Sequence, residues 1–280
     1  MARLSPLAGE VRRLDNDRFL CALFAPPQAR QWLFALYVFN AEVARVREAV
    51  TEPLAGRIRL QWWRDVLQDI YGGGDVPPHQ VARALAAAVR RHRLGRQPFE
   101  RLLEAREFDL DDDAPADMAA LLSYAEATSA TLVGLSLEIL EARDEASRQA
   151  GHHVGLAWSL TGLLRAIPFH AAARRVYLPA TLSRDSGVDF MELFEGRSGP
   201  GLRTAVAEVA EAARRHIEAA RRPGPRVPRR ALPALLPATL AETYLGSLAK
   251  AGFDPFDRRV RAPGRGRLMR LAFSAWRGRY

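Results

Sequence analysis

The chain has 280 residues, of which 48% are hydrophobic and 26% are charged, and its formal net charge is +9 at pH 7. This composition excludes intrinsic disorder, and the length fits one large domain or two modest ones. The single cysteine, Cys21, excludes a disulfide scaffold and a cysteine-based zinc site, and it favours a reducing compartment.

The first residues show no targeting signal. Residues 1–6 lack the apolar stretch of a secretory signal, and the acidic Glu10 and Asp15 follow too soon for a transit peptide. The longest apolar run, at 32–39, is far shorter than the roughly 20 residues that span a bilayer. We therefore expect a cytoplasmic protein without a signal peptide or transmembrane helix, either soluble or peripheral on the inner face of the cytoplasmic membrane.

The basic residues are concentrated in the last third of the chain. Residues 1–199 carry 24 basic and 26 acidic residues, whereas residues 200–280 carry 17 basic and 6 acidic ones. Lys250 is the only lysine, so the basic side chains are almost all arginine. Because high arginine usage partly reflects genome composition, only the clustering indicates an acidic partner.

Hydrophobic periodicity predicts helices along nearly the whole chain. The segment 28–50 is apolar on several sides, and the segment 54–71 is amphipathic, with Ile58 and Trp62 on its apolar side. No stretch longer than four or five residues indicates a strand, so we predict an all-α fold in a single domain over residues 1–280. Further helices are expected at 80–92, 98–108, 116–142, 146–167, 204–222, 232–250 and 267–278.

Two groups of acidic residues are candidate Mg²⁺ ligands. Asp65 and Asp69 are one helical turn apart, but they share a polar side with Arg64 and Gln68, so we expect a solvated face. The acidic run 109–113 lacks EF-hand spacing, and we expect it to be a solvated helix terminus. The sequence contains no HExxH, GxSxG, Walker A or strand-linked GxGxxG motif, which excludes the common hydrolase and nucleotide-binding classes.

Several runs resemble the squalene/phytoene synthase superfamily, and together they extend over most of the chain in the same order. They are Ala-Leu-Tyr-Val-Phe at 35–39, Leu-Gln-Trp-Trp-Arg at 60–64, the segment 124–134, Leu-Leu-Arg at 163–165 and Arg-Val-Tyr-Leu-Pro at 175–179. The resemblance implies a helical bundle around a central cavity that joins two allylic diphosphates head to head. In that family, two aspartate-rich motifs hold the Mg²⁺ that bridges the leaving diphosphate.

The resemblance places those aspartates at positions that are mostly not acidic here. The first motif falls on Ala44, Arg45 and Glu48, and the second falls on Ala166 and His170. Losing the Lewis acid removes several kcal/mol of transition-state stabilisation, which lowers a rate by orders of magnitude. We therefore expect a pseudoenzyme with no catalytic residues, no bound metal and no cofactor.

Ligand binding without turnover is compatible with the same residues. The resemblance suggests that an isoprenoid diphosphate or an anionic lipid binds here. The two arginines of this set are suited to a phosphate group, but structural ion pairs would explain them equally well. The residues expected to contact the ligand are Tyr37, Phe39, Arg165, Arg175 and Tyr177.

The alternative is a divergent head-to-head prenyltransferase with rearranged metal ligands, and only in that case do we expect Mg²⁺ as a cofactor. Glu42 and Glu48 are six residues apart on a helix, so they diverge by about 120° and cannot clamp one ion together. His170 suits a softer metal, although a lone histidine is more often structural.

Four further runs resemble one branch of the superfamily, that of the mitochondrial respiratory complex I assembly factor. They lie at 17–21, 34–42, 68–71 and 274–280. This branch is taken to be non-catalytic and to act in early complex I assembly at the inner membrane. The resemblance therefore implies complex I subunits or assembly intermediates as partners, in a bacterial relative.

The C-terminal segment 265–280 predicts a basic amphipathic helix. Between residues 258 and 280 there are eight arginines and no acidic residue. Such a helix either lies on an anionic bilayer or closes the bundle with its apolar side, and the sequence leaves both open. A nucleic-acid partner is not expected, because no recognised binding motif accompanies the charge. The apolar side contains Leu268, Leu271, Ala272, Ala275 and Trp276.

Overall fold

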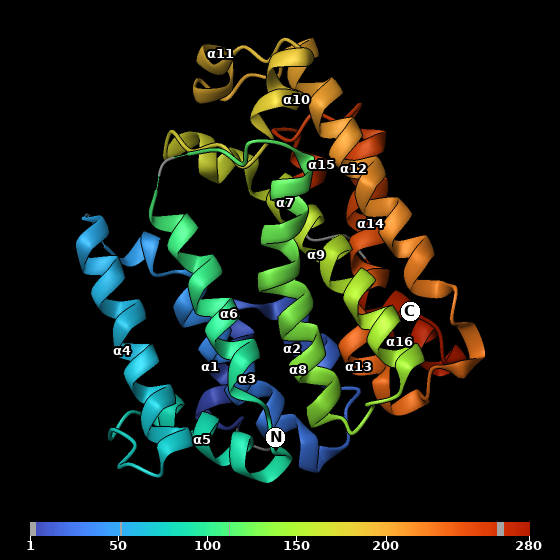
Figure 1. Ribbon diagram of the computed structural model, residues 1–280. Helices are drawn as coiled ribbons and strands as arrows, with labels where there is room; N and C mark the ends of the chain where they lie inside the picture. The colour runs from blue at the N-terminus through green and yellow to red at the C-terminus, as the bar shows by residue number, and fades with distance from the viewer. Residues whose placement is uncertain (1–3, 51, 112, 262–265) are drawn as a thin grey trace.

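A computed structural model describes residues 4–50, 52–111, 113–261 and 266–280, and every regular element within these ranges is a helix (Figure 1). This confirms the predicted all-α class. The longer helices are α1 (Pro6–Leu14), α3 (Pro27–Ala44), α4 (Pro53–Gly72), α5 (Gln80–His92), α6 (Arg96–Glu107), α8 (Thr131–Ile139), α9 (Glu145–Ala172), α12 (Pro200–Arg221), α14 (Pro237–Lys250) and α16 (Arg267–Arg277). The shorter ones are α2 (Asn16–Ala22), α7 (Met118–Ala125), α10 (Ala180–Asp185), α11 (Phe190–Phe194), α13 (Leu232–Leu235) and α15 (Arg258–Arg261).

Local sequence signals account for several helix ends. Pro27 occupies the first turn of α3, where its missing N–H costs nothing. Helix α4 is followed by its C-cap Gly73, whose φ of +78° is accessible to glycine at little cost. Asp144 caps α9, since its carboxylate accepts the backbone N–H of Ser147 at 2.9 Å.

Two hydrophobic clusters form the interior. The first joins α1, α3, α4, α5, α6 and α8, and Phe39 and Phe99 are among its fully buried members. The second joins α9, α12 and α14, which run side by side in Figure 1. Helix α9 contributes to both, because Val154 belongs to the first cluster and Leu160 to the second. The long central helix therefore connects the two halves of the interior.

The predicted helices differ from the observed ones where the chain bends. The first predicted helix, 28–50, ends at Ala44 and continues as a 3₁₀ turn, η1 (Arg47–Ala49). The predicted helix 116–142 contains a π-helical segment, η3 (Glu126–Ala130), between α7 and α8. The expectation for α4 is wrong at Ile58, which is 63% exposed, because this helix buries Leu60 and Trp63 instead.

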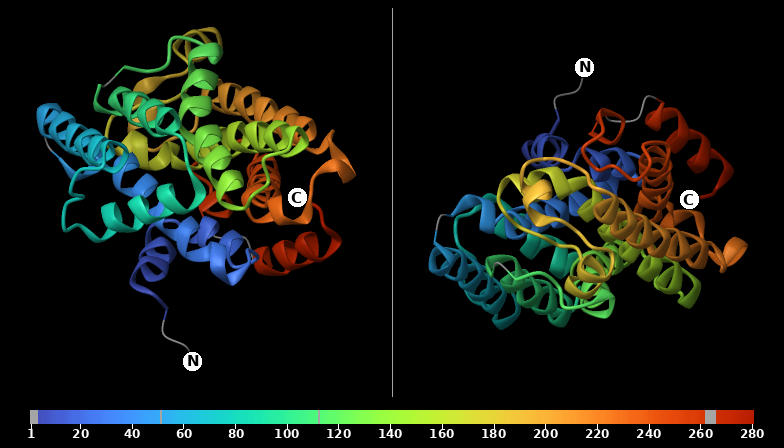
Figure 2. Two further views of the ribbon diagram at one scale, coloured as in Figure 1. Left: turned by 60° about the horizontal axis from the view of Figure 1, so that its bottom comes forward. Right: turned by 90° about the horizontal axis from the view of Figure 1, so that it is seen from above.

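The helix expected at 116–142 contains a long apolar stretch. Within the described residues, the continuous helical stretch Met118–Ile139 is long and apolar enough to cross a bilayer by length and composition alone. It packs against α9, α6 and α3 and lies in the middle of the molecule in both views of Figure 2. These contacts on several sides are those of a core helix in a bundle.

A close approach between α9 and η3 supplies a stability test. A Cβ at Gly155 of α9 would lie 2.2 Å from the Cα of Ala130, which is backbone that cannot move aside. We predict that Gly155→Ala lowers the free energy of unfolding by about 3 kcal/mol, measured by urea denaturation. The matched control is Gly134→Ala in α8, where a Cβ has open space, and it should raise stability by about 0.5–1 kcal/mol. Equal effects of the two changes would contradict this packing.

Candidate functional site

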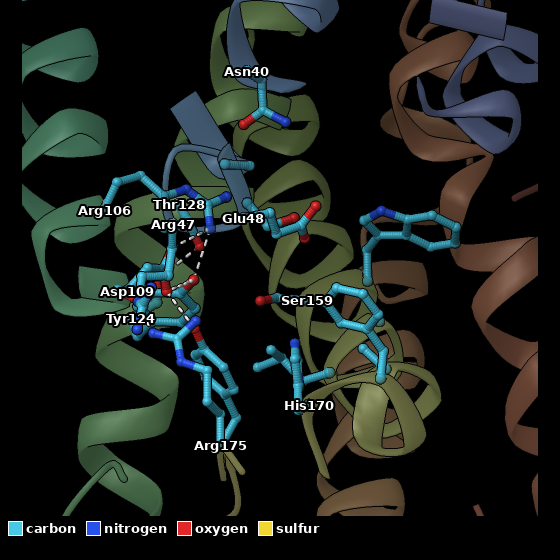
Figure 3. A pocket seen from close by; sticks show the side chains of 18 of the residues that line it. Asn40, Arg47, Glu48, Arg106, Asp109, Tyr124, Thr128, Ser159, His170 and Arg175 are labelled. Atoms are coloured by element: carbon cyan, nitrogen blue, oxygen red, sulfur yellow. Dashed lines mark hydrogen bonds and ion pairs between the residues drawn. The ribbon is translucent and has the colours of Figure 1, made fainter. Parts of the chain in front are cut away.

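A cavity of about 450 Å³ lies where the two hydrophobic clusters meet (Figure 3). Its walls come from α2, the end of α3 with η1, the end of α6 with its 3₁₀ turn η2 (Phe108–Leu110), α7 with η3, and the second half of α9. The connection after α9, residues 173–179, closes one side. The cavity volume lies in the range of small-molecule sites, about 300–1,000 Å³.

The cavity brings together the two sets of positions that the sequence singled out. Ala44 and Glu48 line it from α3 and η1, and Ala166 and His170 line it from α9. Arg45 does not line this cavity; its guanidinium pairs with the Glu48 carboxylate at 3.0 Å on the exposed side of η1. The two helices therefore face each other across the cavity with one carboxylate between them, and that carboxylate already has an arginine partner.

The best-connected group in the cavity wall is Asp109 of η2. One carboxylate oxygen accepts hydrogen bonds from the hydroxyls of Tyr124 and Tyr177, each at 2.8 Å. The other oxygen accepts from Arg106 at 3.0 Å, and Arg106 also donates to the Tyr124 hydroxyl at 2.7 Å. Arg175 donates to the backbone carbonyl of Asp109. Figure 3 shows this cluster along one wall of the cavity.

Asp109 corrects the prediction of a solvated acidic turn. The residue is 6% exposed and sits inside the cavity wall, whereas Asp111 is exposed and pairs with Arg57 at 3.3 Å. Asp112, a third member of the predicted acidic run, lies outside the described residues. Within the acidic run, only Asp109 has apolar residues on both sides and an arginine three residues earlier. This local pattern was the sequence signal that could have indicated a buried ion pair.

The buried network holds its members in defined protonation states. Burial lowers the pKa of Arg106, but Tyr124 and Asp109 outweigh burial and the net shift is upward. Burial raises the pKa of both Tyr124 and Tyr177, and the Asp109 carboxylate raises them further. At neutral pH the two tyrosines are therefore neutral donors and Arg106 is charged. Removing Asp109 would leave a buried charge without its partner.

His170 lines the cavity from α9, beside Tyr177, and is uncharged. Its ring is 4.5 Å from the Tyr177 ring, and its Nδ1 is buried without a hydrogen-bond partner in the described part of the chain. Burial, together with the neighbouring Arg175, lowers the pKa of His170 to about 4. A neutral imidazole faces the cavity, where the resemblance places an aspartate.

A further arginine, missed by the sequence analysis, lines the cavity from α2. Arg18 pairs with Asp15 at 2.6 Å, and its guanidinium lies about 6 Å from the ring centres of Tyr37 and Trp158. Its side chain also reaches the Ser129 hydroxyl at 3.5 Å. The run 17–21 was noted only for its family resemblance, and the position of Arg18 in the cavity wall was not predictable because it depends on contacts with distant helices.

The predicted ligand contacts divide into two groups. Arg175 and Tyr177 line the cavity, together with His170. The other three lie elsewhere. Phe39 is fully buried and packs its ring edge-on against Trp63 and Phe99, which fixes it in the hydrophobic core.

Tyr37 and Arg165 occupy structural positions beside the cavity. Tyr37 is buried behind Arg18, and burial raises its pKa to about 12. Arg165 pairs with Asp17 at 3.6 Å and stacks 3.6 Å from the ring centre of Tyr244. The structural ion-pair alternative raised for Arg165 therefore matches its contacts.

The residues present do not fit Mg²⁺. Glu48 pairs with Arg45, and both oxygens of Asp109 are occupied by the tyrosines and Arg106. Nowhere in residues 4–50, 52–111, 113–261 and 266–280 do three or more His, Cys, Asp or Glu side chains form a group able to hold a metal ion. The cavity wall contains Arg18, Arg47, Arg106 and Arg175 against the carboxylates of Glu48 and Asp109. Of these, Arg18 is paired with Asp15 and Arg106 with Asp109. Guanidinium groups suit an anionic group better than a cation.

Comparison with protein families gives a match over most of the chain. The model of the family "Squalene/phytoene synthase" matches residues 11–266 of this chain. The chain therefore belongs to the squalene/phytoene synthase family, as the sequence runs predicted.

Similar proteins fall into two functional groups. The Bos taurus protein named NADH dehydrogenase (ubiquinone) complex I, assembly factor 6 is 35% identical over 96% of this chain and 81% of its own length. The Homo sapiens protein of the same name is 34% identical over the same shares. A presqualene diphosphate synthase of Rhodopseudomonas palustris is 28% identical over 87% of this chain and 86% of its own length.

Solved structures agree with the family in fold. A dehydrosqualene synthase in complex with a ligand superimposes with a TM-score of 0.84 and 21% identity, over 97% of this chain and 94% of that one. The squalene synthase of Alicyclobacillus acidocaldarius has a TM-score of 0.78 and 21% identity, over 89% of this chain and 94% of that one. At this level of identity the likeness establishes the bundle architecture only.

His170 generates a pH-dependence test. Because its pKa is about 4 in the folded protein and about 6.5 in the unfolded chain, the unfolded chain binds the proton first as the pH falls. Stability from this group is complete above pH 6.5 and is lost towards pH 4, by about 1 kcal/mol per pH unit. We predict a shallower loss between pH 6.5 and 4.5 in His170→Gln, measured by urea unfolding. His216, whose pKa is also about 4, contributes equally to the wild type and to His170→Gln. Equal dependence of stability on pH in the two proteins would therefore contradict the lowered pKa of His170.

Proposed function

We propose that this protein is a non-catalytic member of its family that assists the assembly of respiratory complex I, the NADH:quinone oxidoreductase. The observation that carries the proposal is the match of 96% of the chain to complex I assembly factor 6 at 35% identity, against 28% for a presqualene diphosphate synthase. Complex I subunits or assembly intermediates would be its partners.

The cavity chemistry supports the loss of prenyl transfer. Ionisation of an allylic diphosphate needs charge neutralisation at the leaving group, which Mg²⁺ held by carboxylates supplies in such reactions. Here Ala44 and Ala166 offer no ligand atom, and His170 is a neutral imidazole. The single carboxylate at these positions, Glu48, is engaged by Arg45. This set supports binding of a diphosphate through arginine more readily than its activation through a metal.

The cavity supports retention of an anionic ligand as part of that role. Arg47 and Arg175 enter from opposite ends of the wall that Asp109 organises (Figure 3). The lining also includes the apolar Leu163 and the exposed Phe169 of α9, so a charged head and an apolar tail both have a counterpart. An isoprenoid diphosphate or an anionic lipid has this composition.

A divergent head-to-head prenyltransferase is the second candidate function. It is favoured by one observation, the 28% identity to presqualene diphosphate synthase over 86% of that protein's length. This candidate needs Mg²⁺ as a cofactor and requires ligands other than the described carboxylates of the cavity. The two candidates differ in what they predict for turnover and for complex I content.

The turnover test uses purified full-length protein with farnesyl diphosphate and Mg²⁺. We expect the diphosphate to change the tryptophan emission, because Trp158 lines the cavity, while no presqualene diphosphate or squalene forms. Emission and products are measured in the same samples, and inorganic diphosphate alone serves as a control for the headgroup. Product formation at an ordinary enzyme rate, about 1–10 s⁻¹, would establish the prenyltransferase instead.

The cellular test is deletion of the gene in the organism that encodes this chain. We expect the amount of assembled NADH:quinone oxidoreductase to fall at least several-fold, as measured by native electrophoresis and NADH oxidation by membranes. Reintroducing the wild-type gene should restore it, and succinate dehydrogenase content serves as the control for general membrane damage. Unchanged complex I content would contradict the assembly role, whereas the family membership and the fold would be unaffected.

A further inference from the structure

Helix α16 carries several large apolar side chains that the bundle does not cover. Leu268, Met269, Phe273 and Trp276 are 56%, 76%, 52% and 73% exposed. Only Leu271 is fully buried, against α14 and α2, with Ala275 partly covered beside it. The sequence left two roles open for this helix, and its contacts assign bundle closure to Leu271 and Ala275 alone.

The exposed residues form one continuous arc of the helix. At about 100° per residue, Leu268, Met269, Phe273 and Trp276 fall within an arc of about 140°. The buried seam of Leu271 lies at one edge of this arc, and Arg270 and Arg277 lie beyond the other edge. The Phe273 and Trp276 rings are 6.1 Å apart, and the Arg277 guanidinium lies 4.5 Å from the Phe273 ring centre.

Contacts at both ends hold this arc outwards. At its first turn, Arg267 pairs with Asp17 of α2 at 2.8 Å. Beyond its last turn, Tyr280 is buried and donates its hydroxyl hydrogen to the Ala220 carbonyl at 2.8 Å. Arg229 donates to the Trp276 carbonyl at 3.1 Å. The helix is therefore clamped to the body, and it cannot turn its exposed arc inwards without breaking these contacts.

The charge around the arc has one sign. Arg270, Arg277 and Arg279 are exposed, and residues 266–280 contain no acidic side chain. The nearby carboxylates of Asp17 and Glu242 are paired with Arg267 and Arg221. The surface beside the exposed arc therefore presents uncompensated positive charge. Figure 2 shows α16 at the edge of the molecule, beside the N-terminal helices.

From this combination we infer that α16 docks the protein onto an anionic phospholipid bilayer, with Met269, Phe273 and Trp276 in the headgroup region and the arginines among lipid phosphates. An apolar arc with aromatic residues and flanking arginines is the composition of helices that lie in a membrane interface. The helix has 11 residues and is about 16 Å long, so it lies on the bilayer and does not span it. A nucleic acid would gain nothing from Leu268 and Met269, since only aromatic rings stack with bases.

This inference is independent of the proposed assembly role and is tested by vesicle flotation of the full-length protein. We expect binding to vesicles of phosphatidylcholine with 30 mol% phosphatidylglycerol, and at least tenfold weaker binding to phosphatidylcholine alone. The double change Phe273→Ser, Trp276→Ser should reduce binding to the mixed vesicles at least tenfold. The double change Arg270→Gln, Arg277→Gln should remove most of the preference for the anionic lipid, because each arginine near such a surface contributes roughly fivefold.

The matched control removes exposed apolar side chains elsewhere. Phe190 and Met191 of α11 are 41% and 63% exposed, and Phe190→Ser, Met191→Ser should bind vesicles like the wild type. All these side chains are exposed, so thermal unfolding monitored by circular dichroism should be unchanged. A second readout is the shift of tryptophan emission to shorter wavelength on vesicle addition, which Trp276→Phe should abolish.

Three outcomes would overturn the docking proposal. They are vesicle binding equal in the α16 and α11 variants, an emission shift that persists in Trp276→Phe, and binding to a duplex RNA stronger than binding to the anionic vesicles. None of them bears on complex I content after gene deletion, so failure of the docking proposal and failure of the assembly role are distinguishable.

Discussion

The cavity depends on one buried carboxylate, that of Asp109. It joins Arg106 of α6, Tyr124 of α7 and Tyr177 from the connection after α9, and Arg175 binds the carbonyl of the same residue. Breaking a buried ion pair by removing one partner costs about 3–5 kcal/mol, because a charge is left without compensation. The Asp109 carboxylate therefore holds three separate segments together. Both of its oxygens accept hydrogen bonds from these protein partners in the cavity wall.

The side chains that line the cavity differ from those of a carboxylate-based metal site. Side chains facing the cavity from α3 and α9 are short or neutral at Ala44, Ala166 and His170, while arginines provide the charge. Arginine side chains of this kind bind anionic groups through charge-assisted hydrogen bonds.

The sequence allowed the helical class, most helix positions and the family to be predicted, because each depends on local periodicity or on runs of adjacent residues. It also located Ala44, Glu48, Ala166 and His170, which the fold brings to one cavity. Contacts between distant segments were not predictable. Asp109 looked like a solvated acid because its partners are 15 and 68 residues away along the chain.

The π-helical segment η3 has a consequence for how the interior is divided. One extra residue in a helical turn rotates everything beyond it by about 100°. Before η3, Leu121 of α7 packs into the cluster of α9 and α12; after it, Leu132 and Val133 of α8 pack into the cluster of α3 and α6. A single apolar helix thus changes its inward side halfway along. The register shift lets one continuous element serve two cores, and it places Thr128 and Ser129 at the cavity between them.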